Sequence, residues 1–143
     1  MGKKIITGVQ IRFADADCLG HINNVNLQHY FDLGKMEFYE KALHKTIDPD
    51  DESLILVSTA TNYFRQTRLH DDIYLETAVE KLGKKSVTIY QKLIDRTTGE
   101  VNADCRTVAV GYDFVRQETF PLKQEWIDSM QEYLWNPEDI IVR

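Results

Sequence analysis

The chain has no long apolar run. Of its 143 residues, 43% are hydrophobic, but the uninterrupted runs are only a few residues long, whereas a membrane helix needs about 20. No long apolar region follows the charged Lys3-Lys4 near the start, so we expect neither a signal peptide nor a membrane partner. The length fits one domain over residues 1–143, and the 28% of charged residues favours a soluble protein.

Cysteine is scarce and positive charge is not in excess. Cys18 and Cys105 are the two cysteines, and they lie far apart in the sequence. They form neither the paired spacing of a zinc site nor a disulfide framework. This usage favours a reducing, cytoplasmic location. The net charge of -6 excludes the general basic footprint of a nucleic-acid-binding protein, although it leaves room for local basic patches that bind a phosphorylated substrate.

Hydrophobic periodicity predicts one long helix early in the chain. Two asparagines that could cap a helix occur in His21-Ile-Asn-Asn24, and a helical spacing runs from there to about Leu43. The apolar positions that share one stripe of this helix are Leu27, Phe31, Phe38 and Ala42. Gly34 in the middle costs about 1 kcal/mol against alanine, which indicates close approach of another backbone.

Strand-like alternation dominates the rest of the chain. Residues 9–13 alternate as a short strand does, and after a break at 48–52 the period is two. The predicted long strands are 54–66, 72–82, 85–95 and 102–115, followed by a closing helix at about 122–134. This order predicts an α+β fold in which an antiparallel sheet of about five strands wraps around one long central helix. Free sheet edges favour a homodimer or homotetramer.

The densest functional pattern is Asp15-Ala-Asp17-Cys-Leu-Gly20-His21-Ile-Asn23-Asn24. It ends where the long helix begins, so a carboxylate and the free amides of a helix N-terminus come together. A carboxylate can act as a base or a nucleophile, and amides at a helix start can polarise a carbonyl. These are the elements that ester or thioester hydrolysis needs.

The residues from Phe13 to Asn24 resemble the motif of the hotdog-fold thioesterases, the family that includes 4-hydroxybenzoyl-CoA thioesterase and many acyl-CoA thioesterases. The resemblance implies hydrolysis of an acyl-CoA or acyl-carrier-protein thioester without a metal or redox cofactor. It assigns the catalytic carboxylate to Asp17, as general base or as nucleophile, and the polarising amide to the neighbourhood of Asn24. It gives His21 and Asn23 supporting roles. Leu27 stands where many relatives have tyrosine, which leaves the acyl preference open.

A CoA or acyl-carrier thioester carries phosphate on a long arm, so we looked for basic and hydroxyl side chains. The candidates for substrate binding are Arg65, Arg68, Lys84, Lys85 and Ser86, with Arg106 as a further basic residue and Tyr63 as a residue facing the acyl group or the helix. The Gly83–Ser86 turn combines charge, an amide and a hydroxyl. An ordinary solvated turn explains the same residues equally well.

Other interpretations compete with catalysis by Asp17. Asp15 fits a structural turn residue better than a catalytic one. Cys18 beside His21 could be a thiol nucleophile, but no orienting partner is evident. Two other function classes remain open. One is a hotdog hydratase or dehydratase acting on an enoyl or hydroxyacyl thioester, and the other is a non-catalytic acyl-thioester-binding protein.

Overall fold

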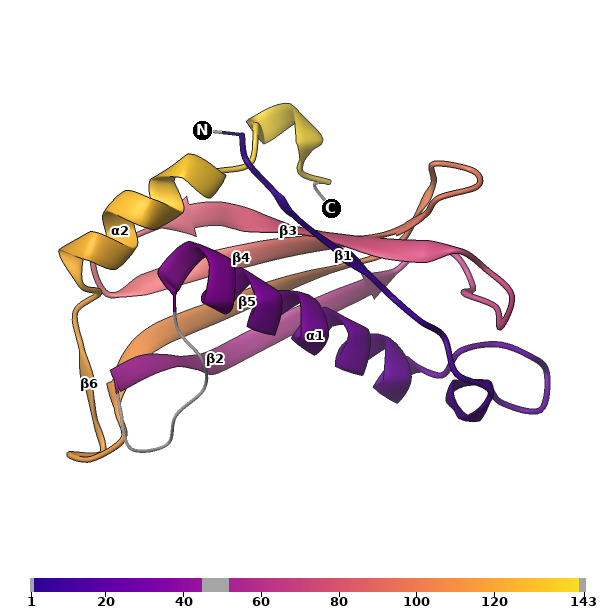
Figure 1. Cartoon of the computed structure of the whole chain (residues 1–143), viewed down its shortest axis with the longest axis horizontal. Coiled ribbons are helices and arrows are strands. Elements are labelled where there is room, and N and C mark those ends of the chain that lie inside the picture. The colour runs from indigo at the N-terminus through magenta and orange to yellow at the C-terminus, as the bar shows by residue number, and fades with distance from the viewer. Residues whose placement is uncertain (1, 45–51, 142–143) are drawn as a thin grey trace.

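The computed structural model describes residues 2–44 and 52–141 (Figure 1). The predicted break at 48–52 lies almost entirely outside the described residues. The strands are β1 (Ile5–Gly8), β2 (Glu52–Tyr63), β3 (Ile73–Leu82), β4 (Ser86–Asp95), β5 (Val101–Asp113) and β6 (Glu118–Phe120). The helices are α1 (Asn24–Leu43) and α2 (Gln124–Met130), with 3-10 turns at Phe13–Asp15, Gln131–Tyr133 and Pro137–Asp139.

The strands form one antiparallel sheet in the order β1-β3-β4-β5-β2, and β6 pairs with the end of β5. The long helix α1 lies across one face of this sheet (Figure 1). The predicted architecture is therefore confirmed, with six strands instead of about five and with α2 as a second helix. Among the described residues, β2 has a strand neighbour only on its β5 side.

Two sequence predictions differ from the structure. The first strand is Ile5–Gly8 and not 9–13, because the Asp15 carboxylate accepts hydrogen bonds from the Arg12 amide and guanidinium and turns the chain there. The closing helix ends at Met130, and a 3-10 turn replaces its predicted last residues. The three-residue strand β6 is too short to show a period in the sequence.

The predicted face of α1 is buried as expected. Asn23 caps the helix by accepting a hydrogen bond from the Asn26 amide (3.0 Å). Leu27, Phe31, Phe38 and Ala42 are all buried. At Gly34 an added Cβ would lie 2.7 Å from Nε2 of Gln91 and 3.0 Å from Oγ1 of Thr77. The close approach at Gly34 is therefore made by side chains of the sheet, not by another backbone.

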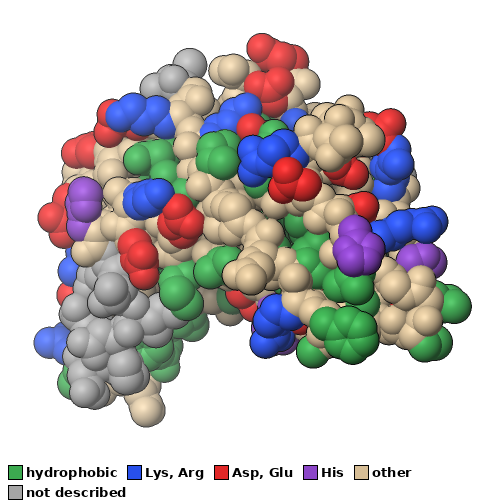
Figure 2. Space-filling view, turned by 45° about the vertical axis from the view of Figure 1, so that its right-hand side comes forward, with side chains coloured by type: hydrophobic (Ala, Val, Ile, Leu, Met, Phe, Trp, Pro, Cys, Tyr) green, Lys and Arg blue, Asp and Glu red, His purple; other side chains and the backbone are tan. Residues whose placement is uncertain are grey.

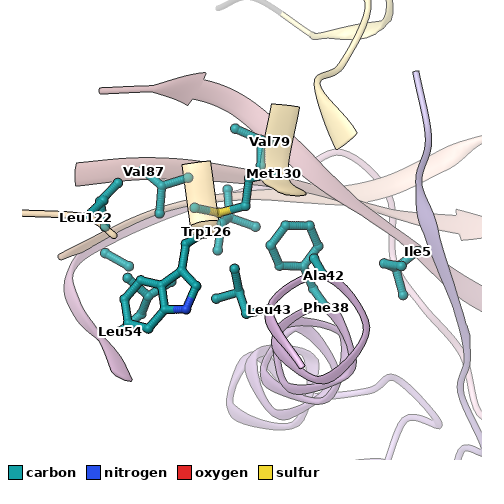
Figure 3. Packing of buried hydrophobic residues seen from close by; sticks show 12 residues of the cluster. Ile5, Phe38, Ala42, Leu43, Leu54, Val79, Val87, Leu122, Trp126 and Met130 are labelled. Carbon is teal, nitrogen blue, oxygen red and sulfur yellow. The ribbon is translucent and has the colours of Figure 1, made fainter. Parts of the chain in front are cut away.

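Two apolar clusters fix α1 on the sheet. The C-terminal half of the helix packs with α2 and the sheet through Phe38, Leu43, Trp126 and Met130 (Figure 3). The N-terminal half contributes Leu27, Tyr30 and Phe31 to a second cluster with β3, β4 and β5. Each fully buried large apolar side chain contributes about 1.5 to 3 kcal/mol. This packing holds the start of α1 in a defined position beside the loop that precedes it.

Candidate active site

Asp15 anchors the loop in front of α1. It is 2% exposed, and its carboxylate accepts a hydrogen bond from the Tyr30 hydroxyl at 2.6 Å. The same carboxylate pairs with Arg12 at 2.9 Å. The hydrogen bond from Tyr30, followed by those from Arg12, keeps the pKa of Asp15 below its ordinary value. The bonded and enclosed position of Asp15 agrees with the structural role predicted for it.

Asp17 has a different setting in the same loop. Its side chain is exposed, and its Oδ1 atom accepts hydrogen bonds from the amides of Leu19 (2.9 Å) and His21 (3.1 Å). Gly20, with a φ of +77°, allows the tight turn that brings these amides back to the carboxylate. Within residues 2–44 and 52–141, Oδ2 of Asp17 has no hydrogen-bond partner. The carboxylate is thus held in one orientation with one oxygen left for chemistry.

The N-terminus of α1 offers unpaired amides. The Asn23 side chain accepts a hydrogen bond from the Asn26 amide and caps the helix, which confirms its predicted capping position. Asn24 is the first residue of the helix, so its amide has no acceptor within the helix. Such amides carry a partial positive charge and can bind an oxygen that becomes negative during a reaction. His21 lies next to this helix start and forms a bridge with Arg68 through its backbone.

A cavity of about 210 Å³ opens at this helix start. Its lining joins the motif to the segment that follows β2: Ile22, Asn24, Leu27, Tyr63, Phe64, Arg65, Gln66 and Thr67. The loop is tied to that segment by hydrogen bonds from the Ile22 amide to the Thr67 carbonyl (2.8 Å) and from the Leu69 amide to the Gly20 carbonyl (3.0 Å). Asn24, Tyr63 and Arg65, predicted separately, therefore surround one space. Asp17 does not line this cavity in its own chain.

The predicted basic residues divide between two ends of the molecule. Arg65 lies at the cavity and forms an ion pair with Glu100, and Arg68 lies beside His21. The turn that contains Lys84, Lys85 and Ser86 joins β3 to β4 at the opposite end of the sheet from the start of α1 (Figure 1). A single chain therefore does not bring this turn to the cavity. Arg106 pairs with Glu80 at 2.7 Å and also lies away from it.

The sequence did not reveal the residues of the cavity wall that follow β2. Phe64, Gln66 and Thr67 line it, but nothing in their own spacing marks them. These residues could have been predicted only from the strand topology, which places the end of β2 beside the loop that carries the motif. Figure 2 turns this end of the molecule forward and shows exposed hydrophobic side chains along its lower side. The large exposed apolar residues of the motif region are Phe13, Leu19 and Val25.

A family model described as the thioesterase-like superfamily matches residues 11–132. The chain therefore belongs to this superfamily, and its antiparallel sheet with a long helix is the hotdog fold. It is similar to the uncharacterised protein YsmA of Bacillus subtilis (strain 168), with 26% identity over 126 residues, which are 88% of this chain and 82% of that protein.

Solved structures show the same fold. A predicted thioesterase from Bacillus stearothermophilus is 24% identical with a TM-score of 0.84, and the match covers 94% of this chain and 99% of that one. A 4-hydroxybenzoyl-CoA thioesterase bound to 4-hydroxybenzoyl-CoA is 15% identical with a TM-score of 0.78, covering 90% and 99%. A gentisyl-coenzyme A thioesterase is 16% identical with a TM-score of 0.75, covering 88% and 99%. None of the helices in the described part of this chain is long and apolar enough to cross a membrane.

Proposed function

We propose that the protein hydrolyses an acyl-CoA thioester to a free acid and CoA. The observation that carries this proposal is the loop of residues 15–24, which holds one carboxylate oxygen of Asp17 by two amides and leads directly into the free amides of α1. Membership of the thioesterase-like superfamily supports the reaction class. The CoA thioesterases among the similar folds favour CoA over an acyl carrier protein as the thiol.

The amide of Asn24 polarises the thioester carbonyl and stabilises the negative oxygen of the tetrahedral intermediate. In one route, Asp17 accepts a proton from water as the water oxygen attacks the carbonyl carbon; the C–S bond then breaks and the CoA thiolate takes up a proton. In the other route, a carboxylate oxygen of Asp17 attacks the carbonyl carbon, and the C–S bond breaks with release of the CoA thiolate, which takes up a proton. Water then hydrolyses the resulting anhydride to the free acid and the Asp17 carboxylate. His21 orients the water or the leaving thiolate beside these groups.

The site requires a second copy of the chain. Asp17 is exposed and does not line the cavity at the start of its own α1. The edge strand β2 carries exposed apolar side chains at Leu56 and Val57, and the exposed Met36 of α1 lines a cavity together with Leu56. Pairing of two β2 edges by two-fold symmetry would cover these residues. We propose a homodimer formed in this way, in which the catalytic carboxylate of one copy faces the helix start of the other.

Two-fold pairing also bears on the phosphate-binding prediction. Antiparallel edge pairing makes the two copies run in opposite directions. The end of one copy that carries the β3–β4 turn then lies at the same end of the joined sheet as the start of α1 of the other copy. Lys84, Lys85 and Ser86 therefore remain candidates for binding the phosphates of CoA across the dimer, while Arg65 and Arg68 are candidates within one chain.

A thiol-release assay over a panel of acyl-CoAs tests the proposal. We expect stoichiometric release of free CoA from at least one member of the panel. In a separate assay, the absorbance of crotonyl-CoA should show no hydration of its double bond. Saturable binding of acyl-CoA without thiol release would instead show a non-catalytic binding protein. Hydration without thiol release would assign the chain to the hydratases.

A further inference from the structure

A buried lysine lies in the middle of α1, where the catalytic proposal does not use it. Lys35 is 4% exposed and faces the sheet, and its Nζ atom donates a hydrogen bond to Oγ1 of Thr107 at 3.1 Å. Nζ also lies 3.2 Å from Oδ1 of Asp32, whose side chain is 59% exposed. Lysine is almost never buried without a partner, because removing its charge from water is costly. Here Thr107 and the exposed Asp32 offset part of that cost.

Lys35 forms part of the wall of a cavity of about 340 Å³. The other lining residues are Asp32, Met36, Tyr39, Leu54 and Leu56. Burial, and then the negative charge of Asp32, raise the pKa of Tyr39 to about 12, so its side chain lines the cavity as a neutral phenol. An ammonium group has three N–H donors, and within residues 2–44 and 52–141 its hydrogen-bond and ion-pair partners are Thr107 and Asp32. The cavity wall is thus mostly apolar apart from the paired Lys35 and Asp32, and the ammonium group has an N–H left to donate to a further partner.

A seam of hydrogen-bonded polar side chains lies between α1 and strands β2 and β5, from Gln28 near the helix start to Thr107 beside Lys35. At the start of the helix, Thr61 donates a hydrogen bond to Oε1 of Gln28 at 3.0 Å. The Thr59 hydroxyl then lies 3.2 Å from Sγ of Cys105 and 3.5 Å from Oγ1 of Thr107. Thr107 is the residue that binds Lys35. Between the helix start and Lys35, the contact of α1 with the sheet is therefore partly polar, and Thr107 belongs to it.

We infer that Lys35 selects acyl groups whose far end carries a carboxylate, so that the substrate is the CoA thioester of a dicarboxylic acid. The inference rests on the proposed function and specifies its substrate class. The incoming carboxylate would share the ammonium group with Thr107 and replace Asp32, which is exposed and can turn toward water. An ion pair whose carboxylate is exposed, as that of Asp32 is, is weakened by solvent screening, whereas a charge-assisted hydrogen bond inside a cavity is strong.

The test compares matched acyl-CoAs that differ only at the far end: butyryl with succinyl, hexanoyl with adipoyl, and octanoyl with suberoyl. A 6-hydroxyhexanoyl-CoA is added as a neutral control. For at least one chain length we expect the wild type to have a kcat/KM about tenfold or more higher for the acid-ended member. In Lys35→Met this preference should disappear or reverse, and Lys35→Arg should restore part of it. Lys41→Met serves as the matched control, because Lys41 is an exposed residue of the same helix that pairs with Glu37.

The outcomes separate the two proposals. Absence of thiol release from every thioester contradicts the proposed function itself. Thiol release with equal or lower kcat/KM for the acid-ended members overturns the role of Lys35 and leaves the thioesterase activity standing. Preference for the hydroxyl-ended substrate over both others also overturns the inference, since it would show that Lys35 and Asp32 together bind a neutral hydroxyl. The wild-type preference is measured without any variant, so a Lys35→Met protein that fails to fold does not remove the test.

Discussion

The hydrogen bond between Tyr30 and Asp15 is predicted to stabilise the loop that carries the candidate catalytic carboxylate. Tyr30→Phe removes the hydroxyl and leaves the ring in the apolar cluster. The buried Asp15 carboxylate then loses the partner at 2.6 Å but keeps Arg12. A hydrogen bond to a charged group contributes about 1.5 to 3 kcal/mol. We expect a loss at the lower end, about 1.5 to 2 kcal/mol, because the Arg12 side chain beside Asp15 is solvent-exposed and the site lies near the surface.

The pH dependence of this loss distinguishes the mechanism. The pKa of Asp15 is lower in the folded protein than in the unfolded chain, so its contribution is present in full above the ordinary carboxyl pKa of about 3.9. It declines as the pH falls through the lowered pKa of the folded state. The difference in unfolding free energy between wild type and Tyr30→Phe should therefore be largest at neutral pH. Below the lowered pKa of the folded state it should shrink to the value of a neutral hydrogen bond, about 0.5 to 1.5 kcal/mol.

Urea denaturation of both proteins at several pH values, followed by circular dichroism, measures the difference. In the same series, Asp15→Asn should lose part of the same stabilisation. The difference in unfolding free energy between Asp15→Asn and the Tyr30→Phe, Asp15→Asn double variant should not show this pH dependence. A wild-type advantage below about 0.5 kcal/mol at neutral pH, or one that does not change on acidification, would refute the assignment of Asp15 as a charged anchor.

Two further substitutions test the packing and the assembly. Gly34→Ala should destabilise the protein by about 1 to 2 kcal/mol in thermal or urea unfolding, because overpacking against Gln91 and Thr77 outweighs the gain of about 1 kcal/mol in helix propensity; a more stable variant would contradict the close contact. Val57→Lys places a charge on the free edge of β2 and should convert the dimer to a monomer, as measured by light scattering. Ile6→Lys, on the outer strand β1, is the control and should leave the dimer intact. Unchanged assembly of Val57→Lys would show that the copies associate elsewhere.

The fold could be predicted largely from periodicity. The stripe of α1 and the alternation of the four long strands each have enough length to reveal their period, and their predicted ranges differ from the observed ones by only a few residues at most ends. The strand predicted at residues 9–13 was wrong because Arg12 and Asp15, three residues apart, bind each other and turn the chain. Local side-chain bonding of this kind overrides a short alternating pattern.

The candidate site could be predicted only in part. The motif identified Asp17 and the helix start because both lie in one continuous segment. The cavity wall after β2 and the buried Lys35 depend on which strands lie beside α1, and this information is not local in the sequence. Lys35 in particular looks like one of the charged residues of a solvated helix face, whereas the structure turns it toward Thr107 and β5.

The most direct test of the central claim is thiol release by Asp17→Asn compared with Asp113→Asn. Both aspartates accept hydrogen bonds from two backbone amides through Oδ1 in a turn, and asparagine keeps that acceptor. With the preferred acyl-CoA, Asp17→Asn should fold like the wild type and lose about 10²- to 10⁴-fold in kcat, whereas Asp113→Asn should retain full activity. Wild-type turnover by a folded Asp17→Asn protein would contradict catalysis by this carboxylate.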